Sequence, residues 1–292
     1  MITTTNGQRK RPNARSRPHW SYSQLNQWMR CPLQFAFERI IKLPRPFVPS
    51  GLLFGSAVHE ALAEYHSQLR NQLPLRPDAI REQFLLTWQT KEEEQPVRFG
   101  KNETRDGLLD QGVALLDKYL EEPPPEQIVG VEEEMAVPLY TSRGELLDAP
   151  MIAVLDLLCR NENGLTVVEC KTSKRKYGEA ELEMAWQATC YVNAVQERYG
   201  EPVSLNYVVL VKTKIPQVQR LTTERSETDL GRLGDTVQSV QKAIEAKAFY
   251  PIESPMNCSG CPYRGPCKEW QGEVGRRTHF NNDREEDRCW SS

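Results

Sequence analysis

Apolar residues between positions 21 and 125 recur three and four residues apart, which is the spacing of amphipathic helices. Ser21 or Ser23 can cap the first helix through its hydroxyl group. Proline-rich stretches at 44–49 and 123–125 mark a stiff linker and the end of this region. The pattern therefore predicts helices over about 24–40, 53–69 and two segments of 77–121 divided near Gly100.

The pattern changes after residue 126, where short runs rich in Val, Ile and Leu alternate with two longer helical segments. The predicted strands cover about 128–140, 151–160, 164–171, 203–212 and 217–223. The predicted helices cover about 179–199 and 227–247. Strands interrupted by long helices indicate an α/β fold with a mixed central sheet flanked by helices. The segment 250–292 is rich in Pro, Cys and charge and has little periodicity.

The stretch 151–171 predicts a β-hairpin, because Asn-Glu-Asn-Gly separates two apolar runs. If these four residues form the loop, Arg160 pairs with Leu165. Counting back along the ladder then places Asp156 opposite Glu169, and directly opposed residues lie about 5 Å apart on one face. The sequence thus predicts two carboxylates on neighbouring strands at one spot.

Strand alternation adds Lys171 to the face of these carboxylates and turns Cys170 away from it. Apolar residues flank the charged trio on its own face, at Val154, Leu158 and Val167. The opposite face is expected to carry Ala153, Leu155, Leu157, Cys159, Val168 and Cys170. This composition is typical of central strands covered on both sides.

Two carboxylates in such a place repel each other unless one binds a proton or both bind a cation. Mg²⁺ or Mn²⁺ takes carboxylate oxygens as ligands and can activate water and polarise a phosphodiester. Lys171 can then orient or deprotonate that water, or stabilise charge that develops on phosphate. The alternative is a buried ion pair of Lys171 with Asp156 or Glu169, without catalysis.

Three further side chains are candidates for the same site. His59 lies near the start of an apolar helix and can supply a nitrogen ligand, although a lone helical histidine is more often structural. Gln187 and Tyr191 lie four residues apart and share one helix face, from which they can contact DNA or orient Lys171. An ordinary helix surface is the alternative for this pair.

The global charge does not favour nucleic-acid binding, because the formal net charge of the 292 residues is −3. Residues 1–20 carry five basic and no acidic side chains, which predicts a disordered solvated arm or, alternatively, an arm that contacts phosphate. The sequence contains no run of about 18 consecutive apolar residues, so no transmembrane helix is expected. The N-terminus lacks the apolar core of a secretory signal. A cytoplasmic protein is expected.

The eight cysteines fit reduced thiols and metal binding better than a secreted disulfide scaffold. Cys258, Cys261 and Cys267 form a C-x₂-C-x₅-C motif, and Cys31 is the candidate for a fourth ligand. Four thiolates suit zinc or an iron–sulfur cluster, and the spacing does not separate the two. Cys159, Cys170 and Cys190 are expected in the core, and Cys289 is unassigned.

The ordered set of motifs resembles the RecB-like branch of the PD-(D/E)XK nucleases, which includes the RecB and AddB nuclease domains and CRISPR-associated RecB-like exonucleases. The resemblance covers about residues 21–270. Its elements, in order, are Ser21-x-Ser23-x-Leu25 before Cys31-Pro32, Gly55-x₃-His59, Asp156, Glu169-x-Lys171, Gln187-x₃-Tyr191 and the C-terminal cysteine triplet. Leu155 stands where the family name places a proline.

The resemblance implies a restriction-endonuclease-like fold and a role for each motif. His59, Asp156, Glu169 and the backbone carbonyl of Cys170 would hold Mg²⁺ or Mn²⁺. Lys171 would be the catalytic lysine, and Gln187 and Tyr191 would support substrate binding. A second carboxylate is expected from Glu132, Glu133 or Glu134, without a choice among them. Cys31, Cys258, Cys261 and Cys267 would hold a 4Fe–4S cluster that fastens the C-terminal segment to the first helix.

The expected organisation is a basic arm over 1–20, one nuclease domain over 21–270 and a charged tail over 271–292. Within the domain, a helical part (21–125) precedes the catalytic core (126–248) and a cysteine segment (249–270) joined by Cys31. The expected function is a DNA exonuclease in repair, recombination or foreign-DNA processing. No Walker A motif is present, so a helicase or a recombination or CRISPR partner would be a separate chain. A non-catalytic DNA-binding subunit and a zinc-stapled scaffold are the alternatives.

Overall fold

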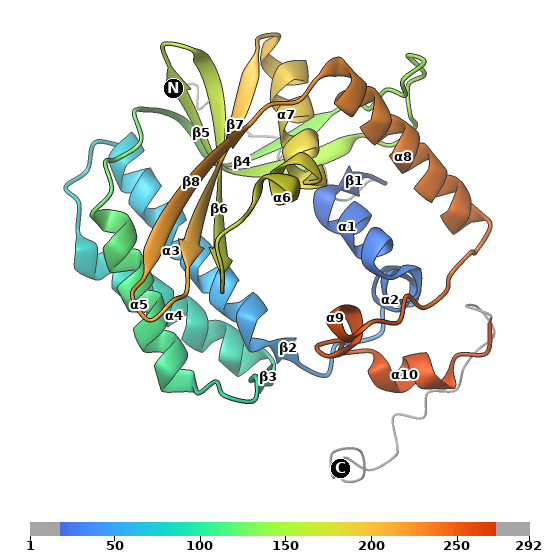
Figure 1. Cartoon of the computed structure of the whole chain (residues 1–292), viewed down its shortest axis with the longest axis horizontal. Coiled ribbons are helices and arrows are strands. Elements are labelled where there is room, and N and C mark those ends of the chain that lie inside the picture. Colours follow the sequence, from blue (N-terminus) through green and yellow to red (C-terminus); the bar gives the residue numbers. More distant parts are fainter. Residues whose placement is uncertain (1–17, 273–292) are drawn as a thin grey trace, which may run out of the picture.

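A six-stranded mixed sheet forms the centre of the molecule (Figure 1), and the computed structural model describes residues 18–272. The sheet order is β1-β5-β6-β7-β8, and β4 also pairs with β5. The strands are β1 (Trp20–Ser21), β4 (Gln127–Val137), β5 (Met151–Asn161), β6 (Gly164–Ser173), β7 (Val203–Val211) and β8 (Gln217–Thr223). β6 and β7 are parallel, whereas the β4–β5, β5–β6 and β7–β8 pairs are antiparallel. The predicted α/β class is confirmed.

The β5–β6 hairpin has the register that the turn signal predicts. Arg160 pairs with Leu165, and the ladder continues to Leu157 opposite Val168. Asn161 also pairs with Gly164, so the turn is tighter than a four-residue loop. Gly164 has a φ of +116°, a backbone conformation that side chains rarely tolerate.

β5 and β6 separate beyond Leu157, at the level of Asp156. β4 pairs with β5 along its whole length, so β6 and β1 must share the other edge of β5. β6 occupies that edge over Leu157–Asn161, and β1 occupies it at Met151 and Ile152. Asp156 therefore lies where the sheet splits, and its neighbour on that edge changes from one strand to another.

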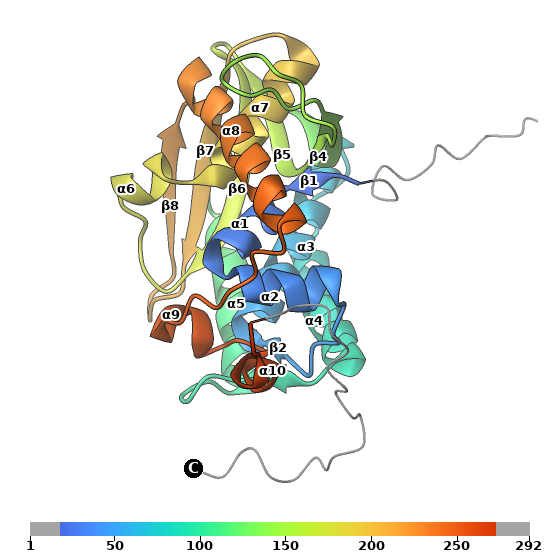
Figure 2. The ribbon, with the colours of Figure 1, turned by 90° about the vertical axis from the view of Figure 1, so that its right-hand side faces the viewer.

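Helices cover both faces of the sheet (Figure 2). One core cluster joins the sheet to α1 (Tyr22–Arg30), α7 (Trp186–Tyr199) and α8 (Glu227–Glu245). The other joins it to α3 (Ser50–Arg70), α4 (Pro77–Glu94) and α5 (Arg105–Leu120). A short parallel pair, β2 (Val48–Pro49) and β3 (Val97–Arg98), lies outside the main sheet. None of the helices in the described part of the chain is long and apolar enough to cross a membrane.

The predicted assignment of side chains to the two faces of β5 was wrong for the first half of the strand. Leu157, Cys159, Val168 and Cys170 pack toward α3, α4 and α5, as expected for one face. Ala153 and Leu155 pack in the opposite cluster, together with Leu158 and Val167. The side-chain alternation thus changes phase at Asp156, where β6 leaves β5. A period-two pattern assumes one continuous ladder and cannot anticipate this change.

The predicted helix over 24–40 is divided at Cys31. Ser21 caps α1, with its Oγ accepting a hydrogen bond from Gln24 N at 3.3 Å. Cys31 is extended (φ −167°, ψ 103°) because it precedes Pro32, whose ring disfavours a helical residue before it. α2 (Pro32–Phe35) and η2 (Ala36–Ile40) follow as separate turns.

The predicted helix over 179–199 is also interrupted, giving α6 (Glu179–Glu183) and α7. The Arg225 guanidinium donates to the carbonyl oxygens of Leu182 at 2.6 Å and Ala185 at 3.3 Å. The same carbonyls also accept backbone hydrogen bonds, from Ala185 N at 3.3 Å and Ala188 N at 3.1 Å, and Ala185 is extended. A side chain distant in sequence thus binds at the break in a segment whose local pattern is helical.

The N-terminal prediction is partly corrected. Residues 1–17, which hold the five basic side chains of the expected arm, lie outside the described residues. Trp20, placed in that arm, is buried and belongs to β1. Residues 273–292 of the expected charged tail also lie outside the described residues.

The C-terminal cysteine segment packs against the first helices (Figure 1). It contains α9 (Pro255–Cys258) and α10 (Arg264–Glu269). The buried Tyr263 ring lies 5.9 Å from that of Phe37, and its hydroxyl donates to Leu43 O at 3.2 Å. Asn257 Nδ2 donates to Arg30 O at 2.9 Å. The two ends of the described chain are thus joined by apolar and polar contacts.

Candidate active site

Asp156 is held by contacts from two different elements. Its Oδ1 lies 3.1 Å from Nδ1 of His59 on α3, and its Oδ2 accepts a hydrogen bond from Cys170 N at 2.8 Å. The side chain is only 15% exposed. The Cys170 amide is free to donate to Asp156 because β5 no longer pairs with β6 at this level. The separation of the strands therefore creates the place that Asp156 occupies.

Glu169 is buried on β6, with a relative exposure of 1%. Its Oε1 accepts hydrogen bonds from Lys171 Nζ at 2.5 Å and from Gln187 Nε2 at 2.6 Å. The same Gln187 amide donates to the Tyr191 hydroxyl at 3.0 Å. Its Oε2 is buried and has no hydrogen-bond partner among the described residues. One carboxylate oxygen at the centre of the site is thus left without a donor.

The electrostatics show that the predicted groups act on one another. Burial, followed by repulsion from Asp156, raises the pKa of Glu169 to about 7. Burial also opposes the charge of Asp156, but the hydrogen bond and positive charge of His59 lower the pKa of Asp156 overall. Although burial works against it, the attraction of Glu169 raises the pKa of Lys171, so the ammonium form is favoured. The hairpin, α3 and α7 therefore bring six predicted side chains into one polar cluster.

Glu132 is the acidic residue of β4 that lies closest to this cluster in the ladder. The β4–β5 register, Val131 with Leu157 and Glu133 with Leu155, places Glu132 level with Asp156. It lines a small cavity together with His59 and Asp156. Its φ of +48° is a left-handed value that is strained for a glutamate. The sequence named three glutamates here without choosing, and the backbone geometry favours Glu132.

The Glu132 carboxyl group carries an electrostatic cost although its side chain reaches solvent. Desolvation by the surrounding protein, followed by repulsion from Asp156, raises its pKa to about 7. Glu132, Asp156 and Glu169 thus place three carboxyl groups close to one histidine and one lysine. A cation would lower the repulsion among them.

The donor set fits a hard divalent cation. Mg²⁺ and Mn²⁺ prefer carboxylate oxygens and accept imidazole nitrogen, and Glu169 Oε2 is a buried acceptor without a donor. In the described part of the chain, however, no three His, Cys, Asp or Glu side chains are arranged closely enough to hold one ion. His59 is instead paired with Asp156, and Lys171 with Glu169. Metal binding at this site would require these pairs to rearrange.

The four predicted cluster cysteines line one cavity. Cys31 lies between α1 and α2, and Cys258, Cys261 and Cys267 come from the C-terminal segment. Burial, followed by the neighbouring thiols of Cys31 and Cys258, raises the pKa of Cys261. The four thiols are therefore neighbours. They are not in ligating geometry, because no three His, Cys, Asp or Glu side chains among residues 18–272 are arranged closely enough to hold one metal ion. Cys159, Cys170 and Cys190 are buried, as predicted for core residues.

Tyr22 is a neighbour of the site that the sequence did not reveal. Burial raises the pKa of its phenol, and the charges of Lys171 and Glu169 also act on it. It lies in the first turn of α1, between two serines that suggest only a helix cap. Its proximity depends on the packing of α1 against the sheet, which no local pattern encodes.

His66 lies on α3 two turns after His59 and lines the same small cavity. It is 1% exposed, and its Nε2 lies 2.9 Å from the Tyr119 hydroxyl on α5. Burial lowers its pKa from 6.5 to about 4, so the folded state requires the neutral ring. Its contribution to stability is therefore complete above pH 6.5 and is lost as the pH falls from 6.5 to about 4.

We expect the free energy of unfolding of the native chain to fall by about 2–3 kcal/mol relative to His66→Gln between pH 7.5 and pH 4.5. Glutamine can still bond to Tyr119 but does not titrate. Urea denaturation of both proteins at the two pH values measures the difference. A difference that does not change with pH would show that His66 is not held neutral.

Comparisons with known proteins identify the family and the fold of the chain. The family model for the PD-(D/E)XK nuclease superfamily matches residues 19–268, so the chain belongs to that superfamily. The protein is accordingly a nuclease of the hydrolase class. Divalent metal ions such as Mg²⁺ are the usual cofactors of these enzymes.

Two solved structures are similar over most of the chain. The crystal structure of a "putative exonuclease" from Eubacterium rectale has a TM-score of 0.55 at 11% identity, covering 94% of this chain and 96% of that one. At this identity the likeness shows the fold alone. SSO0001 has a TM-score of 0.33 at 15% identity, covering 80% of this chain and 91% of that one. No curated protein matches the sequence.

Proposed function

We propose that the chain is a metal-dependent DNA exonuclease of the RecB-like branch. The observation that carries the proposal is the buried Glu169 Oε2, which has no donor among the described residues. The charges of Asp156 and His59, which are paired with each other, also act on the Glu169 carboxyl group. A buried carboxylate oxygen without a donor is costly, and a cation ligand removes that cost. A purely structural ion pair would not need this arrangement.

The proposed metal ligands are His59, Asp156, Glu169 and the backbone carbonyl of Cys170, with Mg²⁺ or Mn²⁺ as the ion. When bound, such an ion supplies Lewis acidity toward a phosphodiester. Glu132 is added to this set as the second carboxylate, because it is level with Asp156 and lines the same small cavity. These residues come from α3, β4, β5 and β6, so the site depends on the assembled fold rather than on one motif.

Lys171 is proposed as the catalytic lysine. Its Nζ lies 2.5 Å from Glu169 Oε1, and its side chain is 26% exposed, so it also reaches solvent. The raised pKa favours an ammonium group, which stabilises negative charge on a phosphate oxygen and orients water. Gln187 and Tyr191 are proposed as positioning residues, because Gln187 holds Glu169 and Tyr191 holds Gln187.

The exonuclease assignment rests on the resemblance of the motifs to the RecB-like branch. The Eubacterium rectale protein of similar fold is likewise described as a "putative exonuclease". A cytoplasmic location, DNA as substrate and a separate helicase, recombination or CRISPR partner belong to the same proposal. The nuclease domain is proposed to extend over 21–270.

End-labelled single-stranded and double-stranded DNA, incubated with the full chain and Mn²⁺ or Mg²⁺, tests the proposal. We expect products shortened from the ends, and no cleavage in EDTA. A circular strand of the same sequence separates exonuclease from endonuclease action, because only an endonuclease cuts it. Intact labelled DNA in every metal would reject the catalytic proposal.

A 4Fe–4S cluster at Cys31, Cys258, Cys261 and Cys267 is proposed as a structural link, with zinc as the alternative. The four thiols line one cavity between the first helices and the C-terminal segment. Anaerobically purified protein should contain about four iron and four sulfide ions per chain. Cys31→Ser should lose most of both, and Cys159→Ser, a buried cysteine of the sheet, should keep them. Stoichiometric zinc without iron in the native chain would overturn the cluster.

A further inference from the structure

A polar cavity of about 480 Å³ lies where β6 and β7 end, between those strand ends and the start of α5. Its lining includes Lys101, Lys174, Lys212, Glu103, Asn102 and Gln111. Three segments far apart in sequence supply the lysines: the loop before α5, the loop after β6 and the residue after β7. Neither the sequence motifs nor the proposed catalytic set includes any of these residues.

The cavity carries a surplus of positive charge in a chain whose formal net charge is −3. Glu103 is the only acidic side chain in its lining. Its carboxylate already accepts from Ser50 Oγ at 2.6 Å, Gly100 N at 2.9 Å and Lys174 Nζ at 3.0 Å. Hydrogen bonds from Ser50 and Gly100 in particular lower its pKa to about 2, so it is ionised at neutral pH. Three ammonium groups against one carboxylate leave two charges unbalanced.

Lys212 is the most buried of the three lysines. It is half-buried, and no carboxylate of residues 18–272 forms an ion pair with it. Its ammonium lies instead 4.4 Å from the centre of the Phe54 ring. Burial, followed by repulsion from Lys174, lowers its pKa. An anion in the cavity would stabilise the charged form of Lys212 against both burial and the repulsion from Lys174.

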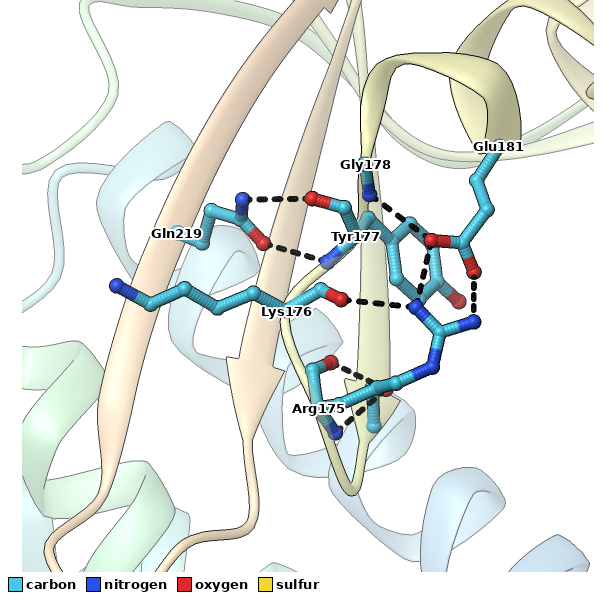
Figure 3. A network of polar contacts seen from close by, with 7 residues as sticks. Arg175, Lys176, Tyr177, Gly178, Glu181 and Gln219 are labelled. Carbon is cyan, nitrogen blue, oxygen red and sulfur yellow. Dashed lines mark hydrogen bonds and ion pairs between the residues drawn. The ribbon is translucent and has the colours of Figure 1, made fainter.

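The loop is fastened by polar contacts directly after Lys174, at Arg175 and Tyr177 (Figure 3). The Arg175 guanidinium forms a two-bond ion pair with Glu181, with both distances 2.8 Å. The Gln219 side chain on β8 bonds to the backbone N and O of Tyr177 at 2.9 and 3.0 Å. Arg175 is thereby paired with a carboxylate, and the two hydrogen bonds with Gln219 hold the loop backbone at Tyr177 before any ligand binds. Prearranged charges lose less entropy on binding than mobile ones do.

The ion pair between Lys174 and Glu103 does not prevent Lys174 from binding a ligand. The Lys174 side chain is 78% exposed, and such surface pairs contribute little. The Lys212 backbone N donates to Ser173 O at 2.7 Å, which holds the β7 end beside the start of the Lys174 loop. Both lysines can therefore face one anion at small cost.

The cavity lies at the end of β6, the strand that carries Glu169 and Lys171. Lys171 and Lys174 are three residues apart, a span of at most about 10 Å in extended chain. If a DNA strand with its reacting phosphate at Glu169 and Lys171 runs along β6 toward Ser173, a flanking phosphate of the DNA reaches the cavity.

We propose that Lys101, Lys174 and Lys212 form a phosphate-binding subsite that holds a flanking phosphate of the DNA substrate. The inference rests on the proposed nuclease function, because it assigns the path of the substrate beyond the reacting bond. The phosphate is either internal to the strand or at its end, and the chemistry of recognition is the same. The alternative is a solvated lysine cluster that has no part in binding.

Fluorescence anisotropy of a labelled single-stranded oligonucleotide, in EDTA so that nothing is cleaved, tests the subsite with the full chain. Lys174→Gln/Lys212→Gln is expected to weaken binding about tenfold. The slope of log affinity against log salt should fall by about 0.7, the value for one phosphate on a single strand. Lys118→Gln is the matched control, because this exposed lysine lies 14 residues along α5 from Thr104, about 20 Å away.

A scan with single methylphosphonates in the oligonucleotide localises the effect. A methylphosphonate at one position of the oligonucleotide should weaken binding to the native chain. The same methylphosphonate should not weaken binding to the double variant any further. Lysine dependence that persists on a circular strand would identify an internal phosphate, and dependence that requires a terminal phosphate would identify an end. A double variant that binds every oligonucleotide as Lys118→Gln does would overturn the subsite.

Two further variants protect the test against misfolding. Lys101→Gln changes an exposed side chain and should weaken binding, whereas Lys212→Arg keeps the charge and should preserve it. Circular dichroism reports whether each variant is folded. Cleavage of the same oligonucleotide in Mn²⁺ separates the two proposals. If the DNA is cleaved but binding does not depend on the lysines, only the subsite is rejected. If binding depends on the lysines but the DNA is not cleaved, the exonuclease proposal is rejected and the subsite stands.

Discussion

Asp156→Asn is expected to reduce DNA cleavage by at least about a thousandfold while leaving the fold and DNA binding intact. The substitution keeps the shape of the side chain but removes the negative charge that His59 and the Cys170 amide hold in place. A divalent cation contributes several kcal/mol of charge stabilisation, and about 4 kcal/mol corresponds to this factor. Initial rates on end-labelled single strands in Mn²⁺, measured beside anisotropy in EDTA, give both quantities.

Asp148→Asn is the matched control for this experiment, because Asp148 is exposed in the loop before β5. It makes the same chemical change away from the split between β5 and β6, and its cleavage rate should equal that of the native chain. Cleavage by Asp156→Asn within a few-fold of the native rate would show that Asp156 is not part of the reacting site.

Glu169→Gln is expected to lower cleavage by a similar factor but to make the metal-free protein more stable at alkaline pH. Burial and Asp156 raise the pKa of Glu169 to about 7, whereas an unfolded chain has the ordinary value of 4.5. The native state therefore binds more protons than the unfolded state between pH 4.5 and 7, and stability falls as the pH rises through this window. Glutamine is neutral throughout and does not carry this loss.

Urea denaturation in EDTA at pH 5 and pH 8 measures the stability effect. The stability of Glu169→Gln relative to the native chain should increase by about 2.5 kcal/mol over this interval. Glu162→Gln in the exposed hairpin turn is the control and should show no such change. An opposite sign, with the variant losing relative stability as the pH rises, would mean that Lys171 stabilises the Glu169 charge more than burial and Asp156 oppose it.

The hairpin could be predicted from sequence because its determinants are local. The Asn-Glu-Asn-Gly turn fixes the register from Asn161 opposite Gly164 to Leu157 opposite Val168. The ladder ends one pair before Asp156 and Glu169, so their predicted pairing is not part of it, although the two carboxyl groups still act on each other. The spacing of Gln187 and Tyr191 likewise predicts one helix face, and both side chains do join the Glu169 network. Helix boundaries set by Ser21 and by proline follow from the same short-range chemistry.

The remaining features depend on contacts between distant segments. The split between β5 and β6 follows from the competition of β1 and β6 for one edge of β5, which a strand pattern does not contain. The break between α6 and α7 is bound by Arg225, about 40 residues away. The choice of Glu132 among three adjacent glutamates depends on a left-handed backbone at that residue. The lysine subsite joins three loops and has no motif at all.

Isothermal titration calorimetry with Mn²⁺ tests most directly whether one divalent cation binds between the two carboxylates. The proteins to titrate are the native chain, Asp156→Asn and Glu169→Gln. Native protein should bind Mn²⁺ at a site that each substitution weakens by at least about tenfold, while Asp148→Asn leaves it unchanged. Equal Mn²⁺ affinity in all four proteins would contradict a shared metal site and would leave Asp156 and Glu169 as partners in structural ion pairs only.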